Sequence, residues 1–483
     1  MATAVSDNVQ FNDLLAGLEK AATVETPDPR HWQRVLDTAA RIGDDDLALL
    51  AARRLAAADP RNPRARALLA DRLSEAGQLR EALAVTRKLD EEDPRNPGLP
   101  LAIGMQLGRL GREEEALASV RVAIRRSPQS AIAWETFANL KTFEQGDRDL
   151  VELERLAVAS PDRPETAGFA FAMAKACDDI GDYDRAFEWF ARGNARVRGS
   201  HLPRLDELFR GAEEVRAAFA PALLDAAAAT DRPERPILVM GCPRSGTTLV
   251  ESILAAAPGA TSGGEMKVLR LACLGFSPPS PERINQFVQQ CGGARAAWER
   301  VASTYVDRLG RRFGTADGVI DKGLVNYLYV GAVALALPDA RILHVRRDPM
   351  DVAWSCFRRR FRDGLYWSYH FESIAGFIRV YEETMAHWKQ VLPGRILSVD
   401  FERLVSSPDE ETARLFEHAG LERPADWQSF HERKGVVMTS SQRQVRRPLN
   451  AEGVQAWQRY EKYLGPLQDA LRRNGLLAAR PAA

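Results

Sequence analysis

The apolar and polar positions of the chain follow two patterns, one on each side of a proline-containing segment at residues 231–236. Before this segment, a unit with helical character recurs from residue 29 to residue 197. After it, short apolar runs typical of strands are followed by apolar-periodic helices, beginning with the run at 237–240 and the helix at 249–257. These patterns predict an α-helical repeat domain followed by an α/β domain with a mainly parallel sheet.

The repeating unit is marked by residues that favour a turn between two antiparallel helices. The segment DPRNP at 59–63 occurs again at 93–97, a shift of 34 residues. In each unit a glycine accepts the positive φ of the turn, a small residue five positions later lets the helices approach, and a proline closes the second helix. The members that keep this step to within one residue are Gly43, Gly77, Gly111, Gly146 and Gly181; Ala48, Ala82, Ala116, Val151 and Ala186; and Pro60, Pro94, Pro128 and Pro161.

The 34-residue period resembles that of tetratricopeptide repeats (TPR), although the large aromatic residues of that family's consensus are mostly missing. We expect four or five copies within 29–197, stacked into a concave surface suited to a peptide. Residues 1–28 are then an N-terminal tail, 198–232 a linker helix, and 233–480 the α/β domain.

Composition excludes several classes of protein. At 483 residues the chain is too long for a single hydrophobic core. Its 45% hydrophobic and 27% charged residues are ordinary for folded domains, so both halves should fold. Lys plus Arg and Asp plus Glu each number 66, which leaves no basic excess for binding nucleic acid or anionic lipid. Any anion-binding site must therefore be local.

The cysteines and the N-terminus bear on the compartment. The five cysteines are scattered and lack CxxC spacing, which predicts neither a disulfide framework nor a zinc site and favours a reducing compartment. The first residues lack the charged and apolar segments of a signal peptide, and no apolar run reaches about 18 residues. We therefore expect a cytoplasmic protein without membrane insertion.

The segment GCPRSGTT at 241–248 lies between an apolar strand and a helix, which is the arrangement of a phosphate-binding loop. Loop amides and the positive end of the helix dipole converge there on one anion. The spacing of its two glycines matches nucleoside-triphosphatase P-loops, but Thr247 occupies the place of their lysine. Because that lysine acts on a magnesium-bound triphosphate, we expect this P-loop-like segment to bind a different anion, contacted by Arg244 and the hydroxyls of Thr247 and Thr248.

A second basic segment follows the predicted strand at 340–345. Arg347 and Ser355 lie at this strand-to-helix connection, where residues of a doubly wound sheet face the ligand crevice. They are therefore candidates to bind a second phosphate. Residues 358–360, all arginines, continue the segment, and we expect them mainly to form a solvated basic face.

PRSGTT after a strand, together with RRDPMDVAWS, resembles the sulfotransferase superfamily over roughly residues 233–464. Within it, the chain is most similar to bacterial repeat-bearing sulfotransferases and to protein-tyrosine sulfotransferases. The resemblance implies that the sulfuryl donor is 3′-phosphoadenosine 5′-phosphosulfate (PAPS). It assigns the 5′-phosphosulfate to Arg244, Ser245, Gly246, Thr247 and Thr248, and the 3′-phosphate to Arg347 and Ser355, with Arg359 also holding the donor.

The resemblance also implies catalytic residues. Glu265 and the glycine before it match the family's GE pair, whose glutamate takes the proton of the acceptor hydroxyl. A phenol, with a pKa of about 10, needs such a base at neutral pH. Lys322, which follows a predicted strand, and Arg244 are expected to neutralise charge on the transferring group. His344 lies inside a predicted strand; we expect it to be a core residue, and it is the weaker candidate for the base.

Two features of the family pattern are less sharply matched. The segment at 439–450 resembles the family's closing loop, which brings a basic residue to the 3′-phosphate, and either Arg446 or Arg447 fits that role. Phe401 stands where tyrosine-directed relatives have a tyrosine that contacts the nucleotide, which puts this contact in doubt.

Together these observations predict in-line transfer of a sulfuryl group from PAPS to an acceptor hydroxyl, without a metal. Peptidyl tyrosine is the first candidate acceptor, held as a peptide or protein by the repeat domain; a glycan, a lipid or a small phenol are the others. Two alternative functions stay open. One is a P-loop kinase, which Thr247 disfavours and magnesium dependence would reveal. The other is a non-catalytic repeat scaffold whose second domain only binds a nucleotide or a partner.

Overall fold

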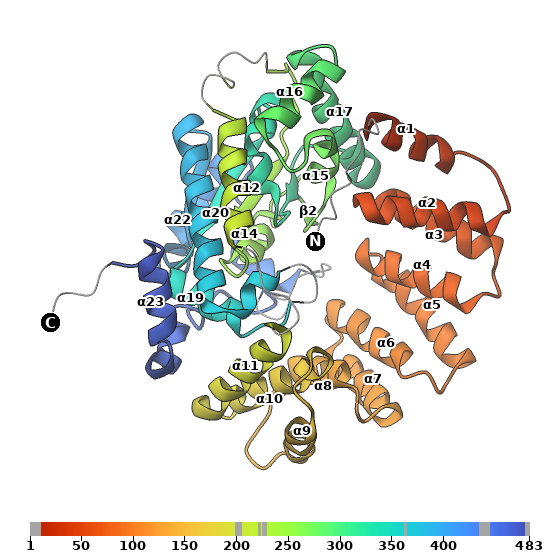
Figure 1. Cartoon of the computed structure of the whole chain (residues 1–483), viewed down its shortest axis with the longest axis vertical. Helices are drawn as coiled ribbons and strands as arrows, with labels where there is room; N and C mark the ends of the chain where they lie inside the picture. The colour runs from red at the N-terminus through yellow and green to blue at the C-terminus, as the bar shows by residue number, and fades with distance from the viewer. Residues whose placement is uncertain are drawn as a thin grey trace.

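The computed structural model of the chain describes residues 11–198, 205–220, 224, 229–361, 365–433 and 445–478. It consists of a repeat arm (residues 29–198) and an α/β body (residues 229–478). The arm curves along one side of the body (Figure 1). No helix in the described ranges combines the length and the apolar character needed to cross a membrane.

The repeat arm is a series of antiparallel helix pairs, which confirms the predicted helical repeats. The repeat glycines all have φ between 75° and 83°. Ala48, Ala82, Ala116 and Ala186 are fully buried, so the paired helices approach closely at these positions. The elements are α2 (Pro29–Ile42), α3 (Asp45–Ala58), α4 (Pro63–Glu75), α5 (Leu79–Glu92), α6 (Gly98–Arg109), α7 (Glu113–Arg126), α8 (Ala131–Leu140), α9 (Arg148–Ala159), η1 (Pro164–Thr166), α10 (Ala167–Asp179) and α11 (Tyr183–Arg198).

The fourth unit of the repeat arm departs from the predicted step. Val151, expected to pack between helices, is 67% exposed, so that expectation was wrong. The connection from Leu140 at the end of α8 to Arg148 at the start of α9 is longer than the connection between α2 and α3. With this longer connection α9 packs against α10 and turns Leu150 and Leu153 toward the core.

The α/β body is built around a parallel sheet. Its strands are β1 (Ile237–Gly241), β2 (Thr261–Gly264), β3 (Val319–Asp321), β4 (Arg341–Arg346) and β5 (Ile396–Asp400). In the described part of the chain they form one five-stranded sheet in the order β2-β3-β1-β4-β5. β1 lies at the centre because it pairs with both β3 and β4. The sequence did not predict β2, because serine and glycine residues such as those at 262–264 are uncommon in strands.

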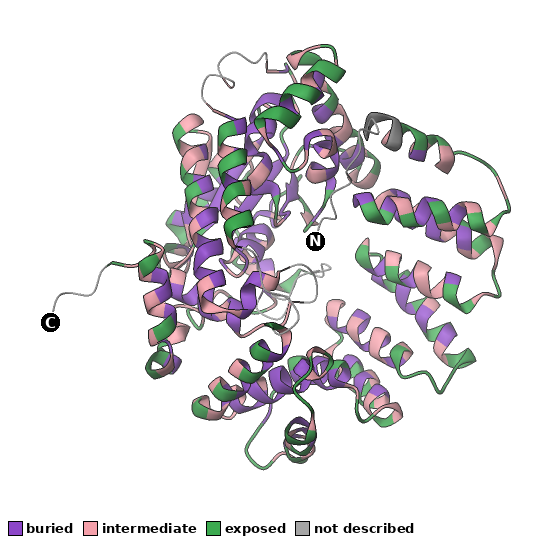
Figure 2. Ribbon diagram, viewed as in Figure 1, coloured by how far each residue is buried: buried purple, intermediate pink, exposed green. Residues whose placement is uncertain are grey.

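Helices pack on both faces of the sheet, and Figure 2 shows the buried residues in purple. Alternate residues of β1 point to opposite faces: Leu238 and Met240 pack in a core with α17, α18 and α20, whereas Ile237 and Val239 pack with α14 and α22. The bounds are α14 (Thr247–Leu254), α15 (Val268–Ala272), η2 (Leu274–Phe276), α16 (Pro281–Gln290), α17 (Ala294–Phe313), η3 (Asn326–Tyr329), α18 (Val330–Ala336), α19 (Pro349–Phe357), η4 (Tyr366–Tyr369), α20 (Phe371–Val391), α21 (Phe401–Ser406), α22 (Pro408–Ala419), η5 (Trp427–Glu432), η6 (Ala456–Tyr463) and α23 (Gly465–Arg473).

Two further helices lie in the segments predicted as tail and linker. α1 (Phe11–Ala22) packs against α2. α12 (Leu205–Ala218) packs against α16 and α20, so this part of the linker adds to the covering of the α/β body.

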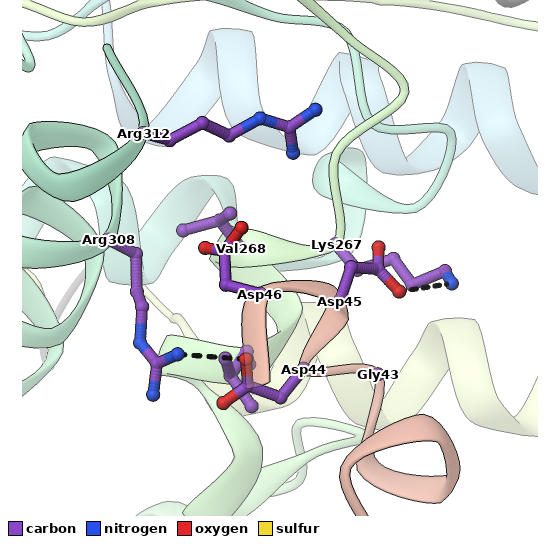
Figure 3. A pocket seen from close by; sticks show the side chains of 9 residues that line it. Gly43, Asp44, Asp45, Asp46, Lys267, Val268, Arg308 and Arg312 are labelled. Atoms are coloured by element: carbon purple, nitrogen blue, oxygen red, sulfur yellow. Dashed lines mark hydrogen bonds and ion pairs between the residues drawn. The ribbon is translucent and has the colours of Figure 1, made fainter. Parts of the chain in front are cut away.

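The first repeat meets the α/β body at the turn between α2 and α3 (Figure 3). Arg308 of α17 donates a hydrogen bond to Asp44, the N-cap of α3, at 2.8 Å. Lys267 donates to Asp45 at 3.0 Å. Because Lys267 follows Glu265 by two residues, this contact reaches the segment that carries the predicted base.

The later repeats share a continuous hydrophobic core with the α/β body. The ring of Phe187 on α11 stacks on Trp354 of α19, with 6.0 Å between centroids, and on Tyr463, with 4.5 Å. The repeat arm is therefore packed against the α/β body near both of its ends.

Candidate functional site

The predicted site residues meet at one edge of the sheet. Because the strands are parallel, their carboxyl ends all lie at this edge, where ligands bind in open α/β sheets. Each strand is followed there by a predicted site residue. In sheet order these are Glu265 after β2, Lys322 after β3, the glycine loop (residues 241–248) at the end of β1, Arg347 after β4 and Phe401 after β5.

The glycine loop turns the chain from β1 into α14. Arg244 and Gly246 have φ values of 75° and 103°, and the first of these is a left-handed conformation that arginine rarely adopts. α14 begins with the buried Thr247 and Thr248, so the amides of its first turn face the loop. Among the described residues, the buried Ser245 Oγ has no hydrogen-bond partner. These features fit a loop shaped to hold an anion.

Hydrogen bonds join the glycine loop to the second basic segment. Arg347 Nη1 donates to the carbonyl oxygen of Arg244 at 2.9 Å, and Arg244 Nε donates to Ser355 Oγ at 2.9 Å. Asp348 caps α19 by accepting from the amides of Met350 and Asp351. The two predicted anion-binding segments are therefore in direct contact, although 111 residues separate Arg244 from Ser355.

Phe401 packs against both of these segments. Its ring centre lies 4.6 Å from the guanidinium carbon of Arg347, a cation–π contact. The same ring covers Gly246, where an added Cβ would lie 2.5 Å from Phe401 Cδ2. Arg347 Nη2 also donates to the carbonyl oxygen of Gly453. The phenyl ring thus holds Arg347 and the glycine loop by packing.

The region around the glycine loop is strongly cationic. Burial, followed by the nearby charge of Arg359, lowers the pKa of Arg244 to about 9, so the guanidinium still carries its charge at neutral pH. Burial also lowers the pKa of Arg347, and the Asp351 carboxylate opposes this shift. Because buried positive charges repel one another, a bound anion would be stabilised here.

Glu265 and Lys322 form an ion pair at the neighbouring strand ends. Lys322 Nζ lies 3.0 Å from Glu265 Oε1. The Lys322 side chain is 1% exposed, whereas that of Glu265 is 36% exposed and can meet an incoming substrate. The backbone amide of Lys322 donates to the carbonyl oxygen of Gly264 at 3.0 Å, which ties the two strand ends together.

Two buried carboxylates beside this pair were not identified from the sequence. Glu251 of α14 accepts hydrogen bonds from Ser262 Oγ at 2.6 Å and from the Gly264 amide at 2.8 Å. Asp321, the last residue of β3, precedes Lys322, and burial raises its pKa to about 6. Neither Glu251 nor Asp321 belongs to a recognised motif. The one sign in the sequence was that each carboxylate stands among apolar neighbours, which indicates a buried acidic residue.

The arginines at 358–360 face the repeat arm, so the expectation of a solvated basic face was wrong. Arg358 donates to Asp178 at 3.1 Å, and Arg360 pairs with Glu135. Arg359 Nη1 donates to Asn139 Oδ1 at 3.3 Å while its charge acts on Arg244. Acidic and amide side chains of α8 and α10 thus hold this basic segment.

The remaining predicted residues have the following contacts. Arg446 donates to the carbonyl oxygen of Arg109 in the repeat arm at 2.8 Å, and Arg447 pairs with Glu452 at 3.3 Å. Residues 439–444 of the predicted closing loop lie outside the described residues. His344 is fully buried, as expected for a core residue, and burial lowers its pKa well below its usual value.

Comparison with known proteins finds a family model that matches most of the α/β body. Residues 236–425 match the model of the sulfotransferase family. An uncharacterized protein of Aquifex aeolicus (strain VF5) is 28% identical over 351 residues, covering 69% of this chain and 45% of that protein. A putative protein-tyrosine sulfotransferase of Caenorhabditis briggsae is 24% identical over 241 residues, covering 46% of this chain and 81% of that protein. The chain spans less than half the length of the first of these relatives.

Solved structures similar to each half have also been found. The sulfotransferase domain from the curacin biosynthetic pathway is 15% identical, with a TM-score of 0.36, and covers 51% of this chain and 97% of that chain. A thermophilic TPR protein of Thermus thermophilus is 20% identical, with a TM-score of 0.29, and covers 35% of this chain and 92% of that chain. The segment that matches the sulfotransferase family model contains Arg244, Glu265, Lys322, Arg347 and Ser355.

Proposed function

We propose that the chain transfers a sulfuryl group from PAPS to an acceptor hydroxyl. The observation that carries this proposal is the convergence of two features on one sheet edge. One is the pair of anion-binding segments joined by the hydrogen bonds of Arg347 and Arg244. The other is the Glu265–Lys322 ion pair at the neighbouring strand ends.

The residues at this edge fit the donor. PAPS, when bound, supplies an activated sulfuryl group on its 5′-phosphate. The buried Ser245 Oγ, which has no partner among the described residues, and the amides at the start of α14 suit the 5′-phosphosulfate. Arg347, whose Nε is also without a partner there, and Ser355 suit the 3′-phosphate. Of the two closing-loop candidates we favour Arg447, because Arg446 is turned to the repeat arm.

The chemistry follows from the charges at the two strand ends. Glu265 accepts the proton of the acceptor hydroxyl, whose oxygen forms the new bond to sulfur. The bond between sulfur and the bridging oxygen breaks, and Lys322 and Arg244 stabilise the negative charge left on that oxygen. The ion pair at 3.0 Å places Lys322 next to the proton acceptor, so acid–base and electrostatic groups already lie side by side.

For the acceptor we propose a peptidyl tyrosine held by the repeat arm. The relative named as a putative protein-tyrosine sulfotransferase and the helical repeats next to the site support this choice. Transfer of labelled sulfur from PAPS to tyrosine peptides, compared with glycans, lipids and small phenols, tests it. Preferential labelling of a non-peptide acceptor would replace this choice without affecting the proposed reaction.

The donor is tested by calorimetric titration with 3′-phosphoadenosine 5′-phosphate in the absence of magnesium. We expect wild type to bind and Arg347→Ala to bind about tenfold to a hundredfold more weakly, because charged hydrogen bonds are lost. Arg346→Ala is the matched control: its side chain is 50% exposed and lies 3.8 Å from Glu382 and Asp400. Magnesium-dependent binding of ATP, without binding of this nucleotide, would favour a P-loop kinase instead.

A further inference from the structure

The glycine-loop helix carries a buried carboxylate that the proposed chemistry does not use. Glu251 lies on α14 between Val250 and Ile253, which are core residues, and only 4% of it is exposed. An isolated ionised carboxylate in such a place is strongly unfavourable unless hydrogen bonds or charges compensate it. The partners that compensate the buried Glu251 carboxylate therefore indicate its role.

The hydrogen bonds of Glu251 go to the segment that presents the proton acceptor. Its Oε1 accepts from Ser262 Oγ at 2.6 Å and from the Gly264 amide at 2.8 Å. Gly264 has a φ of 69° and immediately precedes Glu265. Glu251 thus fixes the backbone position from which Glu265 projects.

The second oxygen of Glu251 faces the catalytic lysine. Glu251 Oε2 lies 3.8 Å from Lys322 Nζ, on a side chain that is 6% exposed. Lys322 is therefore placed between two carboxylates, the buried Glu251 and the more exposed Glu265.

We propose that Glu251 is a positioning residue of the transfer reaction, which orients Glu265 through Gly264 and serves as the lasting counter-ion of Lys322. This inference rests on the proposed function. When Glu265 takes the acceptor proton, its negative charge is neutralised. The Lys322 side chain is 1% exposed and lies near two carboxylates, Glu265 and Glu251. Once Glu265 is neutral, Glu251 is the one of these two that still balances the buried positive charge of Lys322.

The same contacts allow Lys322 to move from Glu265 to the bridging oxygen during the reaction. As the bond between sulfur and the bridging oxygen breaks, negative charge develops on that oxygen, and the ammonium of Lys322 can turn to it from Glu265. Because Glu251 is fixed by two hydrogen bonds and lies 3.8 Å from Lys322 Nζ, the lysine starts from a defined position.

The experiment uses the full chain and a chromogenic probe. Transfer of the sulfuryl group from 4-nitrophenyl sulfate to 3′-phosphoadenosine 5′-phosphate releases 4-nitrophenol, and the nucleotide affinity is measured separately by calorimetry. Glu251→Gln keeps the size and the accepting oxygen but removes the charge. We expect kcat to fall about tenfold to a hundredfold while the Kd of the nucleotide stays within about twofold.

A matched control separates this effect from burial of a charge in general. Glu411 of α22 is also buried and pairs with Arg403 and Arg414. α22 packs against β5, the edge strand on the other side of the sheet from β2. Glu411→Gln should leave kcat unchanged. In a Lys322→Ala background, Glu251→Gln should lower kcat by much less than it does in wild type, because residues that act together are not additive. Glu251→Asp should recover part of the activity.

The outcomes separate the inference from the proposed function. A wild type that neither binds the nucleotide nor releases 4-nitrophenol overturns the proposed function. A wild type that binds the nucleotide but shows no turnover, either with 4-nitrophenyl sulfate or with any acceptor in the labelled-sulfur assay, removes the catalytic roles of Glu265 and Lys322 and overturns the inference with them. An active wild type with an equally active Glu251→Gln overturns the inference alone. So does a variant whose nucleotide affinity and thermal stability fall together with kcat, since that is a defect of folding.

Discussion

Asp321 is the last residue of β3, directly before Lys322 of the candidate site, and its burial disfavours the ionised form. It is fully buried, and burial raises its pKa to about 6 although Asn326, Gly323 and Tyr305 all donate hydrogen bonds to it. The folded protein therefore binds a proton at this carboxyl more readily than the unfolded chain, in which the pKa is near 3.8. Its contribution to stability is present below about pH 4 and is lost as the pH rises through about 6.

Asp321→Asn removes this titration. We expect the free energy of unfolding of wild type to fall relative to that of the variant as the pH rises from about 4 to about 6, by up to about 3 kcal/mol. Urea unfolding of both proteins across this range measures the difference. Tyr305→Phe removes one donor but keeps the carboxyl, so the stability of this variant should still fall with rising pH, over a range shifted to higher pH because the Tyr305 hydrogen bond lowers the pKa of Asp321. A difference between wild type and Asp321→Asn that does not vary with pH would show that the carboxyl does not titrate there.

At the scale of elements, the glycine loop depends on a close contact with the ring of Phe401. Gly246 has a φ of 103°, and an added Cβ would lie 2.5 Å from that ring. Gly246→Ala therefore combines backbone strain with a clash, and we expect it to lower the free energy of unfolding by about 2–4 kcal/mol. The clash would also displace the ring from Arg347, so nucleotide binding should weaken.

Gly259 provides the control for that prediction. Its φ of 76° imposes a similar strain, but an added Cβ would meet nothing within 4 Å. Gly259→Ala should lower the free energy of unfolding by about 1 kcal/mol and leave nucleotide binding unchanged. Urea unfolding and calorimetry measure both quantities, and equal effects of the two substitutions would exclude a role for the ring contact.

The elements that could be predicted are those whose residue types match their local structure. The repeat helices followed from the spacing of turn glycines and buried alanines, and β1 and β4 from short apolar runs. β2 was missed because serine and glycine are uncommon in strands; Gly263 is required there by the close approach of Met266 and of the Ile320 carbonyl, which the local sequence does not reveal. The position of α9 was missed because the longer connection before it changes which residues face inward.

The residues of the candidate site also fall into those that the sequence identifies and those that only the fold identifies. Arg244, Arg347 and Ser355 belong to contiguous motifs, so their sequence neighbours identify them. Glu251 and Asp321 act through partners that are distant in the chain or exist only once the strands have paired. Such residues have no local pattern, and only the folded geometry identifies them.

At the scale of the whole molecule, the repeat arm touches segments that carry site residues at several points. The first repeat contacts Lys267, two residues after Glu265, the proposed base. The carbonyl oxygen of Arg109 accepts a hydrogen bond from Arg446, which lies in the predicted closing loop. α8 and α10 hold residues 358–360, which follow the second basic segment. Because these contacts reach several segments that carry candidate site residues, we interpret the repeat arm as a support of the candidate site.

The contact of Arg308 with the first repeat tests this interpretation. Arg308 and Asp44 are 3% and 1% exposed, and Arg308 also pairs with Glu19 at 2.8 Å. Arg308→Met keeps the length of the side chain but leaves the Asp44 carboxylate buried without its cation. Breaking a buried pair in this way typically lowers the free energy of unfolding by about 3–5 kcal/mol.

We also expect Arg308→Met to lower kcat, because release of the first repeat frees the Lys267 segment that follows Glu265. Arg311→Met is the control: Arg311 lies on the same helix, is 61% exposed and is 3.8 Å from Glu19, so its loss should change stability by less than about 0.5 kcal/mol. Urea unfolding and 4-nitrophenol release are measured on both variants. If Arg308→Met loses stability but keeps full kcat, the first repeat stabilises the fold without supporting the base; if kcat falls at temperatures where the variant remains folded, the repeat arm helps to position Glu265.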